Sequence, residues 1–253
     1  MKIFLAIVAV VIIGVLFLGF LFVRWANKPE TAAKFKKMDE EEAAKKLADE
    51  KRKAEIAQAV ETKKANLKLV IDENFANNRF EFLDYKFEKS SQFKFKDNQF
   101  NYYVFSTRNS YPSNHFIFSK EDFEDFAAEM EFRIHGYEAR AGIFWDAQPN
   151  GDRDPAAYKT AYSSASGLTV EAGDVDESFN LGSFFESITT QKLRVERLSK
   201  NLKVSVNDKV LLDQNTENAG QGKIGIFLRN NGGNKDDSSH SIDIDIKSFK
   251  VWK

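Results

Sequence analysis

The sequence predicts a mainly β protein: an antiparallel β-sandwich preceded by a single transmembrane helix and a charged helical stalk. Apolar and polar residues alternate with a period of two over much of residues 69–253. A long uncharged run stands near the N-terminus, and a run rich in charge but free of Gly and Pro follows it. The implied organisation is a transmembrane anchor with its flanks over residues 1–28, a stalk over 29–68 and a sandwich domain over 69–253.

The anchor is predicted over Ile3–Val23, which contains no charged or polar side chain. As a helix this run would be ~32 Å long, enough to cross a hydrocarbon core of ~30 Å. The alternative is a cleaved secretion signal, whose apolar core is usually only ~7–15 residues long. Arg24 and Trp25 follow the run directly, as is typical of the headgroup level of a bilayer. The lipid bilayer is therefore the first expected partner.

The side of the membrane on which the domain lies is less clearly indicated. Only Lys2 precedes the apolar run, whereas five basic residues follow it closely: Arg24, Lys28, Lys34, Lys36 and Lys37. That bias alone would place the C-terminal region in the cytoplasm. A short basic leader is instead typical of a signal-anchor, and long domains translocate largely regardless of charge. We expect a single-pass protein of the cell membrane with an extracytoplasmic C-terminal domain, with a cytoplasmic one as the alternative.

The stalk is dominated by Ala, Glu, Lys and Leu, which are strong helix formers. Acid-first pairs of opposite charge occur four residues apart and would each add a few tenths of a kcal/mol: Glu30/Lys34, Glu41/Lys45, Glu42/Lys46 and Asp49/Lys53. A coiled coil is the other hypothesis. The apolar residues hold no steady period of 3.5, which favours a lone charged helix that acts as a spacer.

The composition changes from Leu69 onward, where 23 basic residues stand against 29 acidic ones, a net charge of −6. A nucleic-acid partner is not expected, because such a role needs a basic face. The chain also lacks cysteine, so it contains neither disulfides nor thiolate metal sites.

Period-two alternation marks the strands of the domain, and turn residues separate them. Asn207-Asp208 is typical of a hairpin tip, and the alternation slips near Ser248, which indicates a β-bulge. No βα alternation is present, so an antiparallel sandwich is expected. The strands with the clearest alternation lie at 129–135, 193–196, 202–206, 224–228 and 242–251.

The order of several short motifs resembles that of a known superfamily. The motifs are Asp72-Glu73-Asn74-Phe75, Phe123-Glu124-Asp125-Phe126, Gly142-Ile143-Phe144-Trp145, Leu193-Arg194-Val195-Glu196-Arg197, Gly222-Lys223-Ile224-Gly225-Ile226 and the closing Ile244–Val251. This arrangement resembles the concanavalin A-like lectin/glucanase superfamily, in its laminin-G-like and 3-keto-disaccharide-hydrolase-like (DUF1080-type) branch. The resemblance implies a jelly-roll sandwich over residues 69–253.

Glucanases of that superfamily place acidic residues on one strand, commonly as Glu-x-Asp-x-x-Glu, where one carboxylate is the nucleophile and another the acid/base. No such string occurs in this sequence. We therefore expect a membrane-anchored, non-catalytic, lectin-like module that recognises a glycan or a partner protein. The alternative is an accessory or structural subunit of a larger membrane complex, docked through its transmembrane helix and stalk. A glycoside hydrolase is the third hypothesis.

The predicted ligand-binding residues lie on one strand and beside it. Glu129, Glu131, Arg133 and His135 alternate with apolar residues and therefore share one strand face. They would form a polar groove for a sugar or a peptide, with Trp145 as a stacking platform. The alternatives are an ordinary solvated face with charge pairs and a tryptophan of the core.

An acidic loop suggests one further ligand. Asp146, Asn150, Asp152 and Asp154 supply oxygen ligands at spacings that suit calcium. The EF-hand pattern fails, because Pro155 stands where that pattern needs Gly. Laminin-G-like and lectin domains often hold calcium at such a rim, so the resemblance implies calcium, and a turn-rich acidic loop is the alternative.

The first prediction concerns the tether. If Ile3–Val23 is an uncleaved anchor, the full chain should stay in the membrane fraction, because removing such a helix from lipid is unfavourable. Protease treatment of intact cells should digest the C-terminal domain if that domain is extracytoplasmic. A freely dissolved protein with a trimmed N-terminus would contradict the anchor, and a protected domain would favour the cytoplasmic alternative.

Overall fold

The computed structural model divides into two compact units, Met1–Glu55 and Ile56–Lys253. It describes Leu18 and residues 29–75, 91–96, 99–104, 113–135, 139–148, 150, 155, 157–164, 167–181, 189–216, 220–230 and 242–253. Apart from Leu18, the predicted anchor over Ile3–Val23 lies outside these residues. Within them, no helix has the length and apolarity needed to cross a bilayer. The anchor stays a prediction from the sequence.

Helix α2 (Pro29–Asn66) covers most of the segment predicted to form the stalk. Its described ion pairs place lysine first, in place of the acid-first order that we expected: Lys36–Glu40 at 3.9 Å, Lys37–Glu41 at 3.8 Å and Lys51–Glu55 at 4.0 Å. Such exposed pairs contribute little stability. Met38 and Leu47 are also exposed, and the structure gives no support to a coiled coil.

The remaining elements form an antiparallel β-sandwich, which confirms the predicted fold class. All pairings among the described strands are antiparallel. The strands are β1 (Leu69–Glu73), β2 (Ser91–Lys96), β3 (Gln99–Val104), β4 (Ser113–Phe123), β5 (Phe126–His135), β6 (Ala139–Ala147), β7 (Lys159–Ser164), β8 (Gly167–Glu171), β9 (Asp176–Asn180), β10 (Gln191–Leu198), β11 (Asn201–Val206), β12 (Lys209–Asn215), β13 (Gly222–Asn230) and β14 (Ile242–Trp252).

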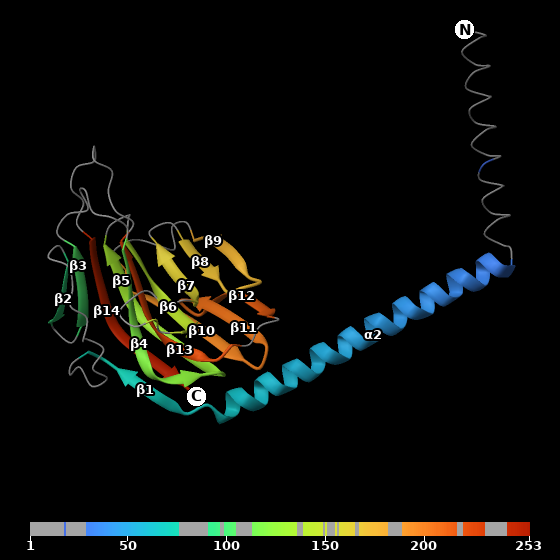
Figure 1. The fold of residues 1–253 in the computed structure, drawn as a ribbon, viewed down its shortest axis with the longest axis horizontal. Helices are drawn as coiled ribbons and strands as arrows, with labels where there is room; N and C mark the ends of the chain where they lie inside the picture. The colour runs from blue at the N-terminus through green and yellow to red at the C-terminus, as the bar shows by residue number, and fades with distance from the viewer. Residues whose placement is uncertain are drawn as a thin grey trace, which may run out of the picture. The chain divides into compact units, whose positions relative to one another are not determined.

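Two sheets make up the sandwich. The eight-stranded sheet has the order β12-β11-β10-β5-β14-β3-β2, and β1 pairs with β14 as well. The six-stranded sheet has the order β4-β13-β6-β7-β8-β9. In Figure 1 β14 and β5 lie side by side in the first sheet, as do β6 and β7 in the second. Strands far apart in sequence are neighbours in both sheets, so the site described below is assembled from distant segments.

Two local predictions are confirmed by the backbone. Asn207 and Asp208 have φ angles of 50° and 65° and connect β11 to β12, as a type I′ hairpin turn requires. The register between β14 and β5 shifts between Ile246 and Ser248, which is the bulge that the change of phase predicted. Because of this bulge, Phe249 and Val251 still face the core.

The core lies between the inner faces of the two sheets. Met130 and Phe132 of β5 and Leu193 of β10 come from the eight-stranded sheet and are at most 1% exposed. Ile143 of β6 and Ile226 of β13 come from the six-stranded sheet and are fully buried. The side chains that alternate with these residues point to the outer faces of the two sheets.

Candidate functional site

The outer face of the six-stranded sheet bears a second group of buried apolar side chains. Phe144 of β6 points outward because its neighbours along the strand point into the core. Rings from β4, β7 and β13 lie on the same face, although a sheet face at the surface of a sandwich is usually solvated. We call this group the aromatic cluster; it comprises Phe116, Phe144, Tyr158, Tyr162 and Phe227.

The rings of the aromatic cluster pack closely against one another. Phe116 meets Phe144 edge-on, with centroids 5.3 Å apart and planes at 78°. Tyr158 lies against Phe116 at 4.8 Å and 66°. These separations and angles are those that aromatic pairs prefer. Tyr158 is half-buried and the other four rings are buried, so Tyr158 is the ring that reaches the surface.

Two glycines make room for this packing. A Cβ at Gly142 would lie 2.6 Å from the Cβ of Tyr162, and one at Gly225 would lie 2.9 Å from the ring of Phe144. Real Cβ atoms do not approach other atoms this closely. Glycine at these two positions therefore allows the rings to lie directly against the sheet.

A hydrogen-bonded chain of polar groups borders the aromatic cluster. Arg140 donates from Nη1 to the hydroxyl of Tyr162 at 3.0 Å, and that hydroxyl donates to Glu171 Oε1 at 3.1 Å. Burial raises the pKa of Tyr162 above its usual value, while the charge of Arg140 acts in the opposite direction. The phenol therefore stays protonated and can donate to the Glu171 carboxylate.

More polar groups continue along the same face onto β8 and β9. Thr169 Oγ1 and Ser178 Oγ share a hydrogen bond of 3.4 Å across the two strands. Asp176 is the register partner of Glu171, and both side chains are exposed. Thr160 Oγ1, also on this face, is buried and has no hydrogen-bond partner. A ring, a cation, two carboxylates and several hydroxyls thus lie on one continuous surface.

The sequence analysis missed this site because its polar residues form no recognisable motif. The available signal was the continuous apolar character of Gly142–Trp145 and Ile224–Leu228, which indicates strands buried on both faces. The neighbouring strand β7 consists mostly of small or polar residues, and only the register of the sheet shows that Tyr162 lies beside Gly142.

The structure places the four predicted β5 residues on the outer face of the other, eight-stranded sheet. All four are partly buried: Glu129, Glu131, Arg133 and His135. Arg133 forms an ion pair with Asp245 of β14 at 2.8 Å, and His135 Nε2 lies 3.6 Å from the same carboxylate. The four residues therefore share one face, as predicted. Charged residues on neighbouring strands already neutralise part of the charge of this face.

Two further contacts show how fully this face is paired. Glu129 accepts a hydrogen bond from Arg194 at 3.3 Å. Asn101 donates to Asp245 at 2.9 Å. Burial alone would raise the pKa of Asp245, but the hydrogen bonds from Arg133 and Asn101 outweigh it and lower the pKa. The arrangement is that of a charge-paired sheet face.

Trp145 does not join that face. It belongs to the six-stranded sheet, is 1% exposed and lies in the core, with its ring 6.3 Å from that of Phe126. The predicted stacking platform is corrected accordingly: no ligand can stack on this ring, because strand alternation points it between the sheets.

The predicted calcium ligands are only partly described. Asp146 directs one carboxylate oxygen at Arg197 and the other at Lys159, 2.9 Å away, so its charge is already compensated. Asn150 is exposed, while Asp152 and Asp154 lie outside the described residues. No cluster of three metal-binding side chains occurs within the described part of the chain. Calcium at this loop stays a prediction.

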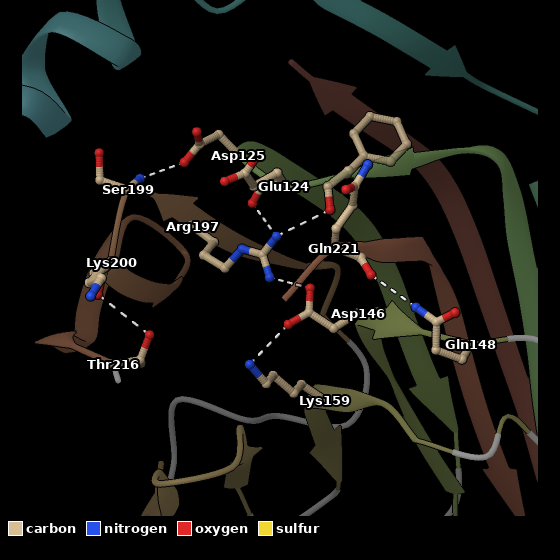
Figure 2. Close-up of polar contacts among 11 residues, drawn as sticks. Glu124, Asp125, Asp146, Gln148, Lys159, Arg197, Ser199, Lys200, Thr216 and Gln221 are labelled. Carbon is tan, nitrogen blue, oxygen red and sulfur yellow. Dashed lines mark hydrogen bonds and ion pairs between the residues drawn. The ribbon is translucent and has the colours of Figure 1, made fainter. Parts of the chain in front are cut away.

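Arg197 of β10 is the centre of a buried polar cluster at one end of the sandwich (Figure 2). Arg197 is 1% exposed, and its guanidinium pairs with Asp146 of the opposite sheet. It also donates to the carbonyl oxygens of Phe123, at 3.2 Å, and of Glu124. Figure 2 shows Arg197 and Lys159 contacting different carboxylate oxygens of Asp146. This cluster links the two sheets to the turn between β4 and β5.

The end of helix α2 joins the sandwich beside this cluster. Lys63, in the last turn of the helix, forms an ion pair with Asp125. Asp125 also accepts a hydrogen bond from the backbone N–H of Ser199, a residue with a φ of 58°. The β4–β5 turn therefore holds both the helix end and the β10–β11 turn.

Comparison with known proteins shows similarity in fold. The sequence matches no protein-family model and no curated protein. The structure is similar to the catalytic domain of an endo-1,3-β-glucanase (laminarinase) from Thermotoga petrophila, with a TM-score of 0.52, 8% identity and coverage of 74% of this chain and 98% of that chain. The fold is a concanavalin A-like β-sandwich. The β-sandwich fold that the motif order implied is confirmed.

Two further solved structures have the same fold. One is a β-glucanase from Bacillus licheniformis, with a TM-score of 0.51, 12% identity and coverage of 72% of this chain and 97% of that chain. The other is a protein of unknown function with a galectin-like fold from Bacillus subtilis, with a TM-score of 0.51, 12% identity and coverage of 73% and 97%.

These comparisons overturn the prediction of a non-catalytic module. That prediction rested on the absence of one acidic string. The architecture is nevertheless shared with glucanase domains that are only about a tenth identical in sequence. At this distance a missing string is no ground for excluding catalysis, because carboxylates from other strands can occupy one face of the same sheet. Glu171 and Asp176 of this chain do so.

The second prediction concerns the buried ion pair. The substitution Arg197→Met should lower the free energy of unfolding by about 3–5 kcal/mol, because Asp146 would lose one of its two cationic partners and the carbonyl oxygens of Phe123 and Glu124 would lose a donor. Urea unfolding followed by tryptophan fluorescence measures this loss. The matched control is Lys203→Met, which removes a partly exposed pair with Asp213 at 3.8 Å and should cost about 1 kcal/mol or less. Equal losses in the two variants would contradict the role assigned to Arg197.

Proposed function

We propose that the outer face of the six-stranded sheet binds a glycan. The observation that supports this is the joint presence of the aromatic cluster and the polar groups of β7, β8 and β9 on one surface. A sugar has apolar C–H patches as well as many hydroxyl groups. It therefore needs a surface that offers both a ring and hydrogen-bonding partners.

The arrangement gives each group a distinct part in binding. Tyr158, the half-buried ring, would contact the C–H face of a sugar, and the four buried rings would hold it in place. Glu171 would accept hydrogen bonds from sugar hydroxyls, and Arg140 and Tyr162 fix its position. Thr169 and Ser178 can each donate and accept. Such pre-arranged groups lower the entropic cost of binding.

The charge-paired face of the eight-stranded sheet supports this choice by contrast. Arg133, Arg194 and their carboxylate partners already satisfy one another there. A ligand on that face would have to break ion pairs before it could form its own. The six-stranded sheet has exposed carboxylates, and no described residue forms a salt bridge with Glu171 or Asp176.

Glycoside hydrolysis is a second candidate function, and a specific pair of residues favours it. Glu171 and Asp176 are directly opposite each other on β8 and β9, so their Cβ atoms lie ~4.5–5.5 Å apart. Glycosidases place two carboxyl groups on either side of the scissile bond. Glu171 beside the Tyr162 hydroxyl and Asp176 across the ladder meet the requirement that two carboxylates share one face.

The setting in the cell is part of the proposal. The predicted helix over Ile3–Val23 would hold the domain at a membrane, and α2 would separate it from the lipid surface. A bracing role in a larger membrane complex and the narrower laminin-G-like or 3-keto-disaccharide-hydrolase-like relationship rest on the sequence alone.

The third prediction tests glycan binding with the full chain in mild detergent. Laminarin, mixed-linkage β-glucan and mucin O-glycans serve as probes, because proteins of the same fold act on glycans of these kinds. Tyr158→Ala and Glu171→Gln should each weaken binding about tenfold or more, which corresponds to the loss of one good contact. Isothermal titration calorimetry measures the affinities.

The control for this experiment is Asp213→Asn, an exposed residue of β12 in the other sheet, which should leave the affinity unchanged. Reducing-end release in the same mixtures tests hydrolysis, and Glu171→Gln should abolish any release. If no probe binds, or if the two site variants bind as well as the unchanged protein, the proposal is wrong.

A further inference from the structure

Two arginines lie side by side at one border of the aromatic cluster. Arg140 of β6 and Arg229 of β13 are register partners in neighbouring antiparallel strands. Their chain neighbours Ala141 and Leu228 are core residues, so both arginine side chains point to the outer face. Side chains at directly paired positions have Cβ atoms ~4.5–5.5 Å apart, and like charges at such positions repel each other.

Neither guanidinium has a carboxylate partner among the residues that the structure describes. Arg140 donates to the neutral hydroxyl of Tyr162 and lies over its ring, 5.1 Å from the centroid. Arg229 forms no ion pair and no side-chain hydrogen bond with a described residue. The Nε atoms of both arginines are buried without a hydrogen-bond partner. Unsatisfied buried donors are destabilising unless a ligand or water completes them.

The Nε atoms of Arg133 and Arg197 are also buried without a partner, but these and other arginines of the sandwich differ from Arg140 and Arg229 in having a carboxylate partner. Arg133, Arg194 and Arg197 each lie within 3.3 Å of a carboxylate. Two adjacent, partly buried guanidinium groups without such a partner form a site for an anion. An anion placed between them would relieve their repulsion and accept their free N–H groups. Guanidinium binds planar or tetrahedral oxyanions with paired hydrogen bonds.

We infer that the glycan bound by this face is anionic and that Arg140 and Arg229 bind its carboxylate or sulfate group. The inference rests on the proposed function, because it places the acidic group of the sugar next to the surface that binds its hydroxyls. Tyr162 connects the two parts, since its hydroxyl accepts from Arg140 and donates to Glu171.

The charges on the rest of the face define the kind of anion. Glu171 and Asp176 lie on β8 and β9, separated from Arg229 by β6 and β7. Residues 69–253 carry a net charge of −6. A polyanion with a charge at each unit, such as a nucleic acid, would be repelled by the carboxylates. A glycan with one acidic group beside neutral hydroxyls would place its acidic group at Arg140 and Arg229 and its hydroxyls at the carboxylates of β8 and β9.

The test measures the binding of the full chain, in mild detergent, to four probes by isothermal titration calorimetry. The probes are a neutral oligosaccharide that carries a single uronic acid for a carboxylate, the same oligosaccharide carrying a single sulfate instead for a sulfate, laminarin for a neutral glycan and polyglutamate for an acidic polymer without sugar. We expect one of the two anionic oligosaccharides to bind at least tenfold more tightly than laminarin and polyglutamate. Raising the salt concentration should weaken that binding, because salt screens partly exposed charges.

The variants separate the arginines from the rest of the face. Arg229→Gln should reduce the affinity for the anionic probe about tenfold or more and change the affinity for laminarin less than twofold. Arg229→Lys keeps the charge but loses the paired hydrogen-bond geometry, so its affinity for the anionic probe should lie between those of Arg229→Gln and the unchanged protein. This variant also tests the inference if Arg229→Gln does not fold. Lys203→Gln, on the outer face of the other sheet, is the matched control and should bind like the unchanged protein.

The outcomes distinguish this inference from the proposed function. If laminarin binds as tightly as the anionic probes and Arg229→Gln has no effect, the inference is wrong while glycan binding stands. If polyglutamate binds as well as the oligosaccharides, the site recognises charge and not a sugar, which also overturns the inference. If no glycan binds at all, both proposals fail.

Discussion

Near its centre the six-stranded sheet is buried on both faces, and the candidate site depends on this constraint. Ile143 and Trp145 fill the space between the sheets, while the aromatic cluster covers the opposite side. Gly142 and Gly225 allow the rings to lie against the backbone. No charged group can stay in the middle of such a face without a costly loss of hydration. Charge is therefore found at its borders, in Arg140 and Arg229 on one side and Glu171 on another.

The two outer faces of the sandwich differ in how their charged residues are arranged. On the eight-stranded sheet, basic and acidic residues alternate between neighbouring strands, so that Arg133 and Arg194 are neutralised within the protein. On the six-stranded sheet, rings and hydroxyls separate Arg140 and Arg229 from Glu171 and Asp176, although Lys223 of β13 pairs with Asp122 of the edge strand β4. A ligand gains more binding free energy on a surface with separated and unpaired charges, because it can supply the opposite charges that the protein does not provide.

One end of the sandwich has a structural task that is separate from binding. Arg197 and Asp146 join the two sheets there, and the same turn between β4 and β5 receives Lys63 from the end of α2. The last turns of the helix thus belong to the same compact unit as the sandwich, Ile56–Lys253. Removing Arg197 would leave the carbonyl oxygens of Phe123 and Glu124 and one oxygen of Asp146 without a donor, so this end of the domain tolerates little change.

The features that depend on local order along the chain could be predicted from the sequence. Period-two alternation predicted β5, β10, β11, β13 and β14, Asn207-Asp208 predicted a hairpin, and the phase change near Ser248 predicted the bulge. The shared face of the four β5 residues also followed from alternation. The local sequence could not predict that Trp145 points into the core, because a continuously apolar strand has no polar residues to mark which side faces outward.

Tertiary structure alone decided which strands are neighbours. The contacts of Tyr162 with Glu171 and Arg140, the pairing of Arg140 with Arg229, and the capture of Asp146 by Arg197 all join residues whose relation depends on sheet register. A shift of one residue would send each of these side chains to the opposite face. Pairing is a property of the folded sheet, fixed by burial of the core, and no short motif encodes it.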